Sequence, residues 1–144
     1  MKALRLLATN GRAAWSEVAK VLGFSAPSAA ERVRQLEKCG VIRGYEARMD
    51  AKSLGYGLTA FVAVTLPREK ERARFLRAVA STPEIMECHH TSGEDDYILK
   101  VRCKDTDDLE RVIGQNLKKR AEVRTRSIIV LSTSKETAVL PMFS

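Results

Sequence analysis

The sequence predicts an α+β protein, with an N-terminal winged helix-turn-helix followed by a C-terminal ferredoxin-like βαββαβ (α/β-sandwich) domain. Residues 15–45 have the pattern of two short helices joined by a tight turn, then a glycine and a short strand. Residues 59–132 alternate between strand-type and helix-type apolar spacing. The expected order is a strand over 59–66, a helix over 69–81, strands over 84–91 and 97–103, a helix over 105–120 and a strand over 123–132. Gly55 and Gly57 interrupt the chain between these regions, so we expect a hinge there. The expected domains are residues 1–50 and 58–144, joined by the hinge at 51–57.

The helix that starts at Ser25 carries the most information. Ser25 is a strong N-cap residue, Pro27 is tolerated in a first turn, and Gly40 stands where a left-handed stop is needed. Opposite its apolar face lie charged or amide side chains: Glu31, Arg34, Gln35 and Lys38. With a preceding helix over 15–22, this is the helix-turn-helix pattern. Spacing alone also fits a helical hairpin with a solvated polar face, but the basic bend at 40–45, which suits a wing, favours the first interpretation.

Charge and composition restrict the partner and the compartment. Residues 1–50 hold nine Lys/Arg against five Asp/Glu, and residues 51–144 hold sixteen against thirteen, within a formal net charge of +7. The first domain is therefore the more basic per residue, which suits a polyanion partner. The longest uncharged stretch, 53–67, is shorter than the roughly 20 apolar residues of a membrane-spanning helix. Arg5 interrupts the only early apolar run, and three cysteines lack a framework spacing, so we expect a cytoplasmic protein with no membrane partner.

Two stretches of the first domain resemble a known family. The segments LGFS and ERVRQLEKCGVIRGYEARMD, with the upstream pair Gly11-Arg12, resemble the DNA-binding half of the bacterial and archaeal Lrp/AsnC transcriptional regulators. The resemblance implies that double-stranded DNA is a partner. The candidate set for DNA contact is Arg34 and Gln35 for base edges, Arg12, Lys38 and Arg43 for phosphates, and Ser25, Ser28 and Glu31 beside them.

The apolar pattern of the predicted strands indicates a second copy of the chain. In the strand over 59–66, and again over 128–131, apolar side chains point to both sides. Two helices cover only one face of such a sheet, so the other face needs a cover. A twofold partner that packs sheet on sheet is the simplest provider, and we expect a homodimer that assembles into higher oligomers. The alternative is a set of scattered surface apolar residues.

The loop over 91–96 is a second candidate site. Without other information it is a polar hairpin connection in which Gly93 provides the bend. The stretch ECHHTSGEDDYILKV, however, is similar to the effector loop of Lrp/AsnC regulators, where small molecules, often amino acids, bind between dimers. The resemblance implies that Thr91, Ser92 and Gly93 meet a carboxylate and that Glu94 or Asp96 holds an ammonium group. Asp95 stands where the family often has an aromatic residue, so we expect a more acidic pocket that favours polar or basic effectors.

Metal-binding and catalytic alternatives have little support in the sequence. In the run Cys88-His89-His90, neighbouring side chains of a strand point to opposite faces, and zinc sites need three or four ligands, so no metal site is predicted. There is no Gly-rich phosphate loop, nucleophile elbow or HExxH helix, and we predict no catalytic residue and no cofactor. Sirohaem decarboxylases resemble this two-domain architecture, but the second domain here has no Trp and lacks their His-rich pattern.

The combined interpretation is a sequence-specific transcriptional regulator that responds to a small molecule, with an amino acid as the expected effector class. Two recognition helices on a dimer would enter successive major grooves about 34 Å apart. A different class of function is also open, namely a ligand-binding assembly protein with a non-functional DNA head. Its motivation is the first predicted helix, 2–9, which is shorter than family members usually carry. A sirohaem-decarboxylase-like enzyme is the least favoured alternative.

Overall fold

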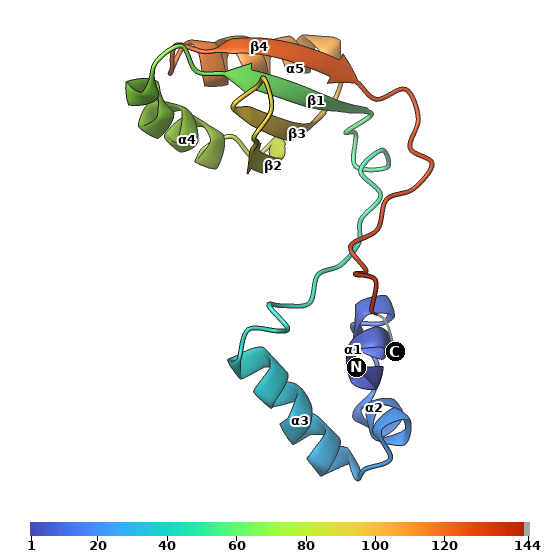
Figure 1. Cartoon of the computed structure of the whole chain (residues 1–144). Helices are drawn as coiled ribbons and strands as arrows, with labels where there is room; N and C mark the ends of the chain where they lie inside the picture. Colours follow the sequence, from blue (N-terminus) through green and yellow to red (C-terminus); the bar gives the residue numbers. More distant parts are fainter. Residues whose placement is uncertain (143–144) are drawn as a thin grey trace. The chain divides into compact units, whose positions relative to one another are not determined.

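The computed structural model describes residues 1–142 and contains two compact units (Figure 1). The first unit is Met1–Arg48 together with the C-terminal segment that begins at Ser134. The second unit is Met49–Thr133. Each unit has its own apolar core, so each is described by itself.

The C-terminal segment is hydrogen-bonded to Arg5 of the first helix and to Arg48, which lies outside the helices. The guanidinium of Arg5 donates to the carbonyl oxygen of Met142 over 2.6 Å. Arg48 donates in the same way to the carbonyl oxygen of Glu136 over 3.3 Å. These two bonds explain why residues 134–142 group with the first unit. The predicted division into 1–50, 51–57 and 58–144 stays a prediction.

Three helices form the first unit: α1 (Lys2–Thr9), α2 (Trp15–Leu22) and α3 (Ala26–Lys38). The predicted ranges of the first two helices are confirmed. Gly23 ends α2 with φ +73°, a left-handed conformation that suits glycine. Ser25 caps α3, because its hydroxyl oxygen accepts from the backbone N–H of Ser28 over 3.4 Å. The buried core consists of small side chains: Ala3, Val18, Ala19, Ala29 and Val33.

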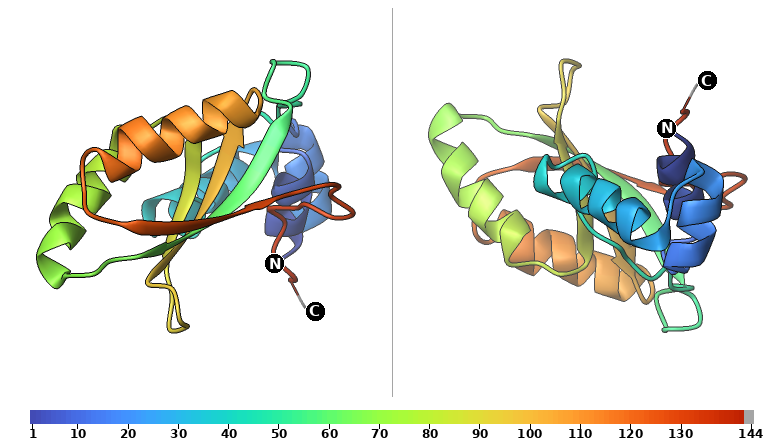
Figure 2. Two further views of the ribbon diagram at one scale, coloured as in Figure 1. Left: turned by 90° about the horizontal axis from the view of Figure 1, so that it is seen from above. Right: turned by 90° about the horizontal axis from the view of Figure 1, so that it is seen from below.

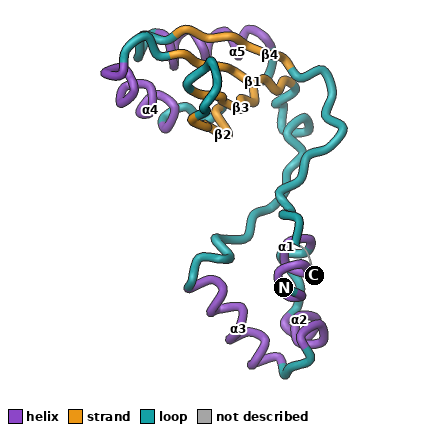
Figure 3. The backbone as a smooth tube through the Cα atoms, in the orientation of Figure 1, coloured by secondary structure: helices purple, strands orange, loops and turns teal. Residues whose placement is uncertain are grey.

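In the described chain, the strand expected over residues 40–45 as a wing is absent, and that expectation was wrong. Residues 39–57 contain neither helix nor strand (Figure 3). The segment instead folds back on the end of α3. The backbone N–H of Ile42 donates to the carbonyl of Leu36 over 3.0 Å, and the Tyr45 hydroxyl donates to Glu37 over 2.9 Å. A strand needs a neighbouring strand for its backbone groups, and no strand exists among residues 1–48 and 134–142.

The second unit has the predicted order strand, helix, strand, strand, helix, strand. Its four strands form one antiparallel sheet in the order β2-β3-β1-β4, which confirms the ferredoxin-like class. The elements are β1 (Leu58–Thr65), η1 (Glu69–Glu71), α4 (Arg72–Ala80), β2 (Ile85–His90), β3 (Tyr97–Cys103), α5 (Thr106–Arg111), η2 (Val112–Lys118) and β4 (Arg124–Ile129).

The helices of this unit cover one face of the sheet. Alternate residues of the two central strands are fully buried, among them Val62 of β1 and Leu99 of β3. They pack with Phe75 of α4 and Leu117 of η2 in one cluster. Figure 2 shows α4 and the α5–η2 segment next to each other, in agreement with their contacts. The opposite face of the sheet has no cover within the unit.

The last helix departs from the single α-helix expected over 105–120. After α5 the chain continues as a π-helical stretch, η2, in which the N–H of Lys119 donates to the carbonyl of Gly114, five residues back. The wider turn fits the packing, because Val112 and Leu117, also five residues apart, are both fully buried. Packing therefore sets the helix period here. No helix within residues 1–142 is long and apolar enough to span a membrane.

Candidate functional site

The outer face of α3 carries a small hydrogen-bonded group. One carboxylate oxygen of Glu31 accepts from the Arg34 guanidinium over 2.8 Å, and the other accepts from the Gln35 amide, also over 2.8 Å. The hydrogen bonds of Gln35 and Arg34 lower the pKa of Glu31 below its ordinary value, so this carboxylate stays charged. All three side chains are exposed, and such a surface pair is weak enough to open when a better partner arrives. Glu31 thus holds an arginine and an amide side by side.

The two serines at the start of α3 are occupied with each other. The Ser25 hydroxyl donates to the Ser28 hydroxyl over 3.0 Å, in addition to its capping role. Ser25 is therefore a structural residue in this unit, while Ser28 stands in the first turn, where a helix N-terminus favours an anion.

The three cations assigned to phosphates lie on exposed parts of the first unit. Arg12 precedes α2, Lys38 ends α3, and Arg43 follows it. None of the three has a carboxylate partner among residues 1–142. Their charge is therefore available to an external anion.

One aromatic contact on α3 was missed by the sequence reasoning. The Arg32 guanidinium lies over the ring of Phe24, 4.2 Å from its centroid. Phe24 is in the turn between the two helices, so this contact ties the turn to α3. The sequence did contain a signal for this contact. Arg32 stands at the edge of the apolar stripe of the helix, where a long side chain can reach the preceding turn.

In the second unit, the predicted effector loop is tied to two other strands by its acidic residues. Asp96 accepts from the backbone N–H of Leu66 over 2.6 Å, just past the end of β1. Asp95 accepts from the Thr65 hydroxyl over 3.3 Å and pairs with Arg126 of β4 over 2.9 Å. The expectation that Asp95 makes the effector pocket more acidic stays a prediction, and in this unit Arg126 pairs with the Asp95 carboxylate. Sequence spacing gave no sign of this pairing, because the partner is on another strand.

The remaining loop residues divide into occupied and available groups. The Thr91 hydroxyl donates to the carbonyl of Asp95 over 2.5 Å, and the Thr91 N–H donates to the carbonyl of Asp96 over 3.0 Å. Thr91 is therefore used to close the loop. Ser92, Gly93 and Glu94 are exposed, and Glu94 has no ion-pair partner within residues 1–142. Of the two carboxylates predicted to hold an ammonium group, Asp96 accepts the Leu66 N–H, and Glu94 is the more exposed.

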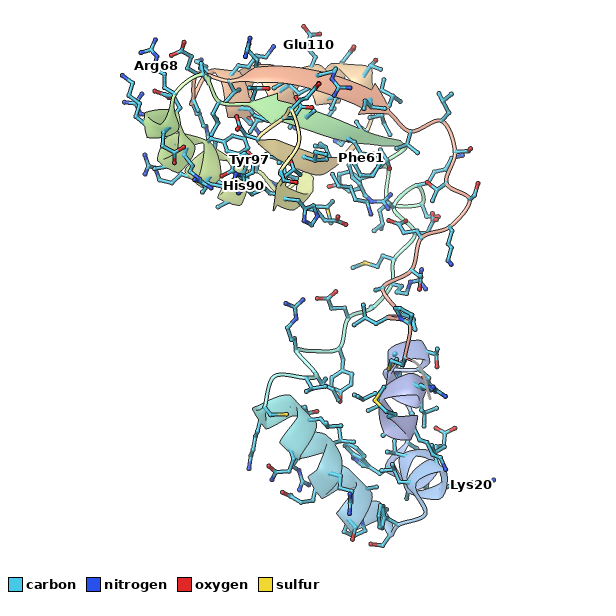
Figure 4. The ribbon with its side chains drawn as sticks, in the orientation of Figure 1. Lys20, Phe61, Arg68, His90, Tyr97 and Glu110 are labelled. Carbon is cyan, nitrogen blue, oxygen red and sulfur yellow. The ribbon has the colours of Figure 1, made fainter. Side chains whose placement is uncertain are left out.

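Beside this loop lies a cluster that the sequence did not indicate. His90 ends β2, Tyr97 starts β3, and the two residues are paired across the strands with ring centroids 5.0 Å apart (Figure 4). The Arg72 guanidinium donates to the Tyr97 hydroxyl over 2.8 Å and lies 3.5 Å from the His90 ring nitrogen. Hydrogen bonds with Glu69 and Tyr97 raise the pKa of Arg72, so it carries its positive charge at the base of the loop.

The run Cys88-His89-His90 is divided as strand geometry requires. His89 pairs with Glu87 over 3.1 Å, while Cys88 is half-buried and burial raises the pKa of its thiol. Within residues 1–142, no group of three or more His, Cys, Asp or Glu side chains is placed to hold a metal ion.

The uncovered face of the sheet carries large apolar side chains next to two basic residues, Lys100 opposite Phe61 and Arg126 opposite Ala63. Phe61 of β1 pairs with Ile128 of β4, and Ala63 of β1 pairs with Ile98 of β3, so these four side chains share one face. Phe61, Ile98 and Ile128 are 39%, 38% and 50% exposed, although each is a large apolar residue (Figure 4 labels Phe61). We call these four residues the apolar sheet patch. The predicted two-sided apolar pattern of this strand is present in the structure.

Comparison with known proteins covers both units. A family model of the AsnC-type helix-turn-helix domain matches residues 1–37, and one of the Lrp/AsnC ligand binding domain matches residues 59–140. The chain is 38% identical to the HTH-type transcriptional regulator LrpA of Mycobacterium tuberculosis over 130 residues, 90% of this chain and 86% of that relative. It is 36% identical to the leucine-responsive regulatory protein of Escherichia coli over 137 residues, 93% of this chain and 84% of that relative.

Solved structures agree along nearly the whole chain. A transcriptional regulator from Neisseria meningitidis in complex with L-methionine superposes with a TM-score of 0.92 at 30% identity, covering 97% of this chain and 92% of that one. A feast or famine regulatory protein from Mycobacterium tuberculosis, complexed with L-methionine, gives a TM-score of 0.89 at 35% identity, covering 96% and 93%. The chain therefore belongs to the Lrp/AsnC family of helix-turn-helix transcriptional regulators.

Proposed function

We propose that this regulator reads double-stranded DNA with α3 and that an amino acid bound to its second unit modulates the binding. The DNA part depends on one observation, the arrangement in which Glu31 holds Arg34 and Gln35 side by side on an exposed helix face. Arginine and amide side chains make paired hydrogen bonds with guanine and adenine in the major groove. Arg34 and Gln35 are therefore assigned to base edges, and Arg12, Lys38 and Arg43 to phosphates.

Gel-shift titration on the chain's own upstream DNA tests this assignment. Arg34→Ala removes a base contact, and we expect about 10-fold weaker binding at the cognate site with little change on unrelated DNA. Lys52→Ala removes one positive charge outside the first unit and serves as the matched control. Binding no tighter than that of an unrelated basic protein would contradict the proposal. It would favour the ligand-binding assembly protein with an inactive DNA head.

The effector part of the proposal places an amino acid at the loop over 91–96. Two of the similar solved structures contain L-methionine, which supports this class of ligand. In this chain, the exposed residues Ser92 and Gly93 would offer backbone N–H groups to a carboxylate, and exposed Glu94 would offer its carboxylate to an ammonium group. Asp96 is engaged at the end of β1 and contributes its charge from there.

A thermal-shift screen of the twenty amino acids tests the effector site. A ligand at 100 times its Kd stabilises the folded state by about 2.7 kcal/mol, which raises the melting temperature by about 5–10 °C. Glu94→Gln is expected to abolish the shift. Glu110→Gln removes an exposed carboxylate on α5 (labelled in Figure 4) and should leave the shift unchanged. A shift of equal size in Glu94→Gln would contradict the assignment.

We propose that the second unit forms a homodimer through the apolar sheet patch, and that dimers assemble further. A face with three large apolar side chains exposed to water is unfavourable, and a twofold partner buries the same patch on both copies. Such a dimer would present two α3 helices to one duplex.

The proposal includes no catalytic role, since the family consists of transcriptional regulators. It includes a cytoplasmic location, where the DNA target lies. Mixing the protein with sirohaem and recording the absorption spectrum tests the enzymatic alternative, for which a spectral change would count.

A further inference from the structure

The positive charge of this chain is concentrated in two segments of the second unit. Residues 68–81 hold five Lys/Arg against two Asp/Glu, and residues 114–126 hold five against one. Together these segments carry +7, residues 1–50 carry +4, and the remaining residues of the chain carry −4. The first segment contains α4, and the second contains the end of η2 and the start of β4.

The fold brings these segments together. α4 packs against η2, and a groove of about 420 Å³ lies between them. Its lining residues are Arg74, Arg77, Ala78, Ser81 and Arg120. We call this the arginine groove. Arg74, Arg77 and Ser81 are spaced i, i+3 and i+7 along the α4 segment, so they share one face of it.

Two of the three arginines are held in place. Arg120 donates to the Ser81 hydroxyl over 2.7 Å, which fixes its guanidinium across the groove from the end of α4. Arg74 lies 3.6 Å from Glu71, a buried carboxylate whose other oxygen accepts from the backbone N–H of Glu122. Arg77 is exposed and has no carboxylate partner among residues 1–142. Three guanidinium groups therefore face one acid, and the groove keeps a positive charge.

An ordinary solvated helix face is the competing interpretation, since arginine stems often cover apolar surface while their heads stay in water. Three features argue for a binding site. The cations come from two segments far apart in sequence, they line a concave surface, and they are arginines, whose planar fork matches phosphate oxygens. The same two segments also carry exposed Lys70 and Lys119, while Arg68 is paired with Glu122 over 3.4 Å. These additional cations suit a chain of phosphates rather than one small anion.

We propose that the arginine groove binds phosphate groups of the DNA backbone and gives the regulator a second, sequence-independent DNA contact in its C-terminal unit. The inference rests on the proposed DNA-binding function. It has a distinct consequence, because each neutralised phosphate adds about 0.9 to the slope of log affinity against log salt. Contacts made by the groove should therefore appear as salt dependence that is the same on cognate and on unrelated DNA.

The experiment is a DNA titration with the full-length protein at several salt concentrations. Arg77→Gln/Arg120→Gln removes two groove cations without altering α3, and we expect the salt slope to fall by about 2 on both kinds of DNA. Lys52→Gln is the control for loss of a charge elsewhere in the second unit and should leave the slope unchanged. Circular dichroism melting of each variant checks that the fold is retained. Arg77→Glu, which leaves the Arg120–Ser81 bond intact, should weaken binding further by repelling phosphate.

Three outcomes would overturn the inference. The first is a slope in the double variant and in Arg77→Glu equal to that of the wild type. The second is a reduction that Lys52→Gln produces equally. The third is calorimetric binding of inorganic pyrophosphate that both variants lose while DNA binding is unchanged, which would assign the groove to a small anion. A wild-type protein with no DNA binding would instead contradict the proposed function itself, so the two failures are distinguishable.

Discussion

The two units of this protein differ most in what they bury and what they expose. The first unit buries small side chains, with alanines and valines as its fully enclosed residues. The second buries a phenylalanine, leucines and valines between a sheet and its helices. Burial of apolar area stabilises a fold by about 25 cal/mol per Å². The larger apolar core of the second unit therefore contributes more to the free energy of unfolding than the core of the first unit does. The helix-turn-helix unit is therefore expected to be the less stable of the two.

The two units also differ in the surface that they expose: the first presents polar side chains and the second presents apolar ones. The first unit presents a polar helix face with Arg34 and Gln35, which suits a hydrated, charged partner. The second presents the apolar sheet patch, which suits a protein partner. The second unit therefore holds the larger apolar core and the exposed apolar patch, whereas the first presents polar and basic side chains.

The largest effect is expected from shortening a core side chain of the second unit. Leu99→Ala leaves a cavity in a fully buried site and should cost about 2–5 kcal/mol. Val18→Ala removes less apolar volume from the first unit and should cost about 1–2 kcal/mol. Urea titration separates the two, because Trp15, the only tryptophan, reports on the first unit and far-ultraviolet circular dichroism reports on both. An equal cost in the two variants would contradict the comparison.

A second prediction concerns pH. Burial, followed by the nearby charge of Asp108, raises the pKa of the Cys103 thiol to about 11, against an ordinary value of 9.0. The folded state therefore keeps a proton that the unfolded state has lost, and stability falls as pH rises from about 9 to 11. The loss should be roughly 2–3 kcal/mol. Urea titrations of wild type and Cys103→Ala at both pH values measure it as a difference between proteins. The same pH dependence in Cys103→Ala would exclude Cys103 as the cause.

The smallest effect is expected at the N-cap of α3. Ser25→Ala removes the acceptor for the Ser28 N–H. We expect the free energy of unfolding of the first unit, followed by Trp15 fluorescence in a urea titration, to fall by about 1 kcal/mol. Ser25→Asp keeps an acceptor at the same place and should restore most of the stability. If the variant with alanine unfolds like the wild type, the capping bond does not support the first unit.

The sequence predicted those elements whose boundaries depend on local chemistry. The ranges of α1 and α2, and that of β3, follow from apolar period and from a glycine or a polar residue at each end. The expected strand over 40–45 failed because strand formation depends on a partner, and the segment bonds to the end of α3 instead. The π-helical turn in η2 could not be predicted from the sequence either, since it depends on how Val112 and Leu117 pack in the core.

The candidate sites show the same limit. The outward face of α3 could be predicted from helix period alone, but the bridge that Glu31 makes between Arg34 and Gln35 depends on side-chain rotamers. In the effector loop, the pairing of Asp95 with Arg126 joins residues far apart in sequence. The arginine groove could not be predicted from the sequence for the same reason, because α4 and η2 come together only in the folded unit.

The central claim is that the apolar sheet patch joins two copies so that recognition helices act in pairs. Sedimentation equilibrium of the full-length protein at micromolar concentration tests it directly. We predict a mass of at least twice the 16.0 kDa of one chain for the wild type. We also predict that Phe61→Lys, which places a charge in the patch, raises the dimer dissociation constant at least about 100-fold. A wild-type protein that sediments at 16.0 kDa would contradict the account.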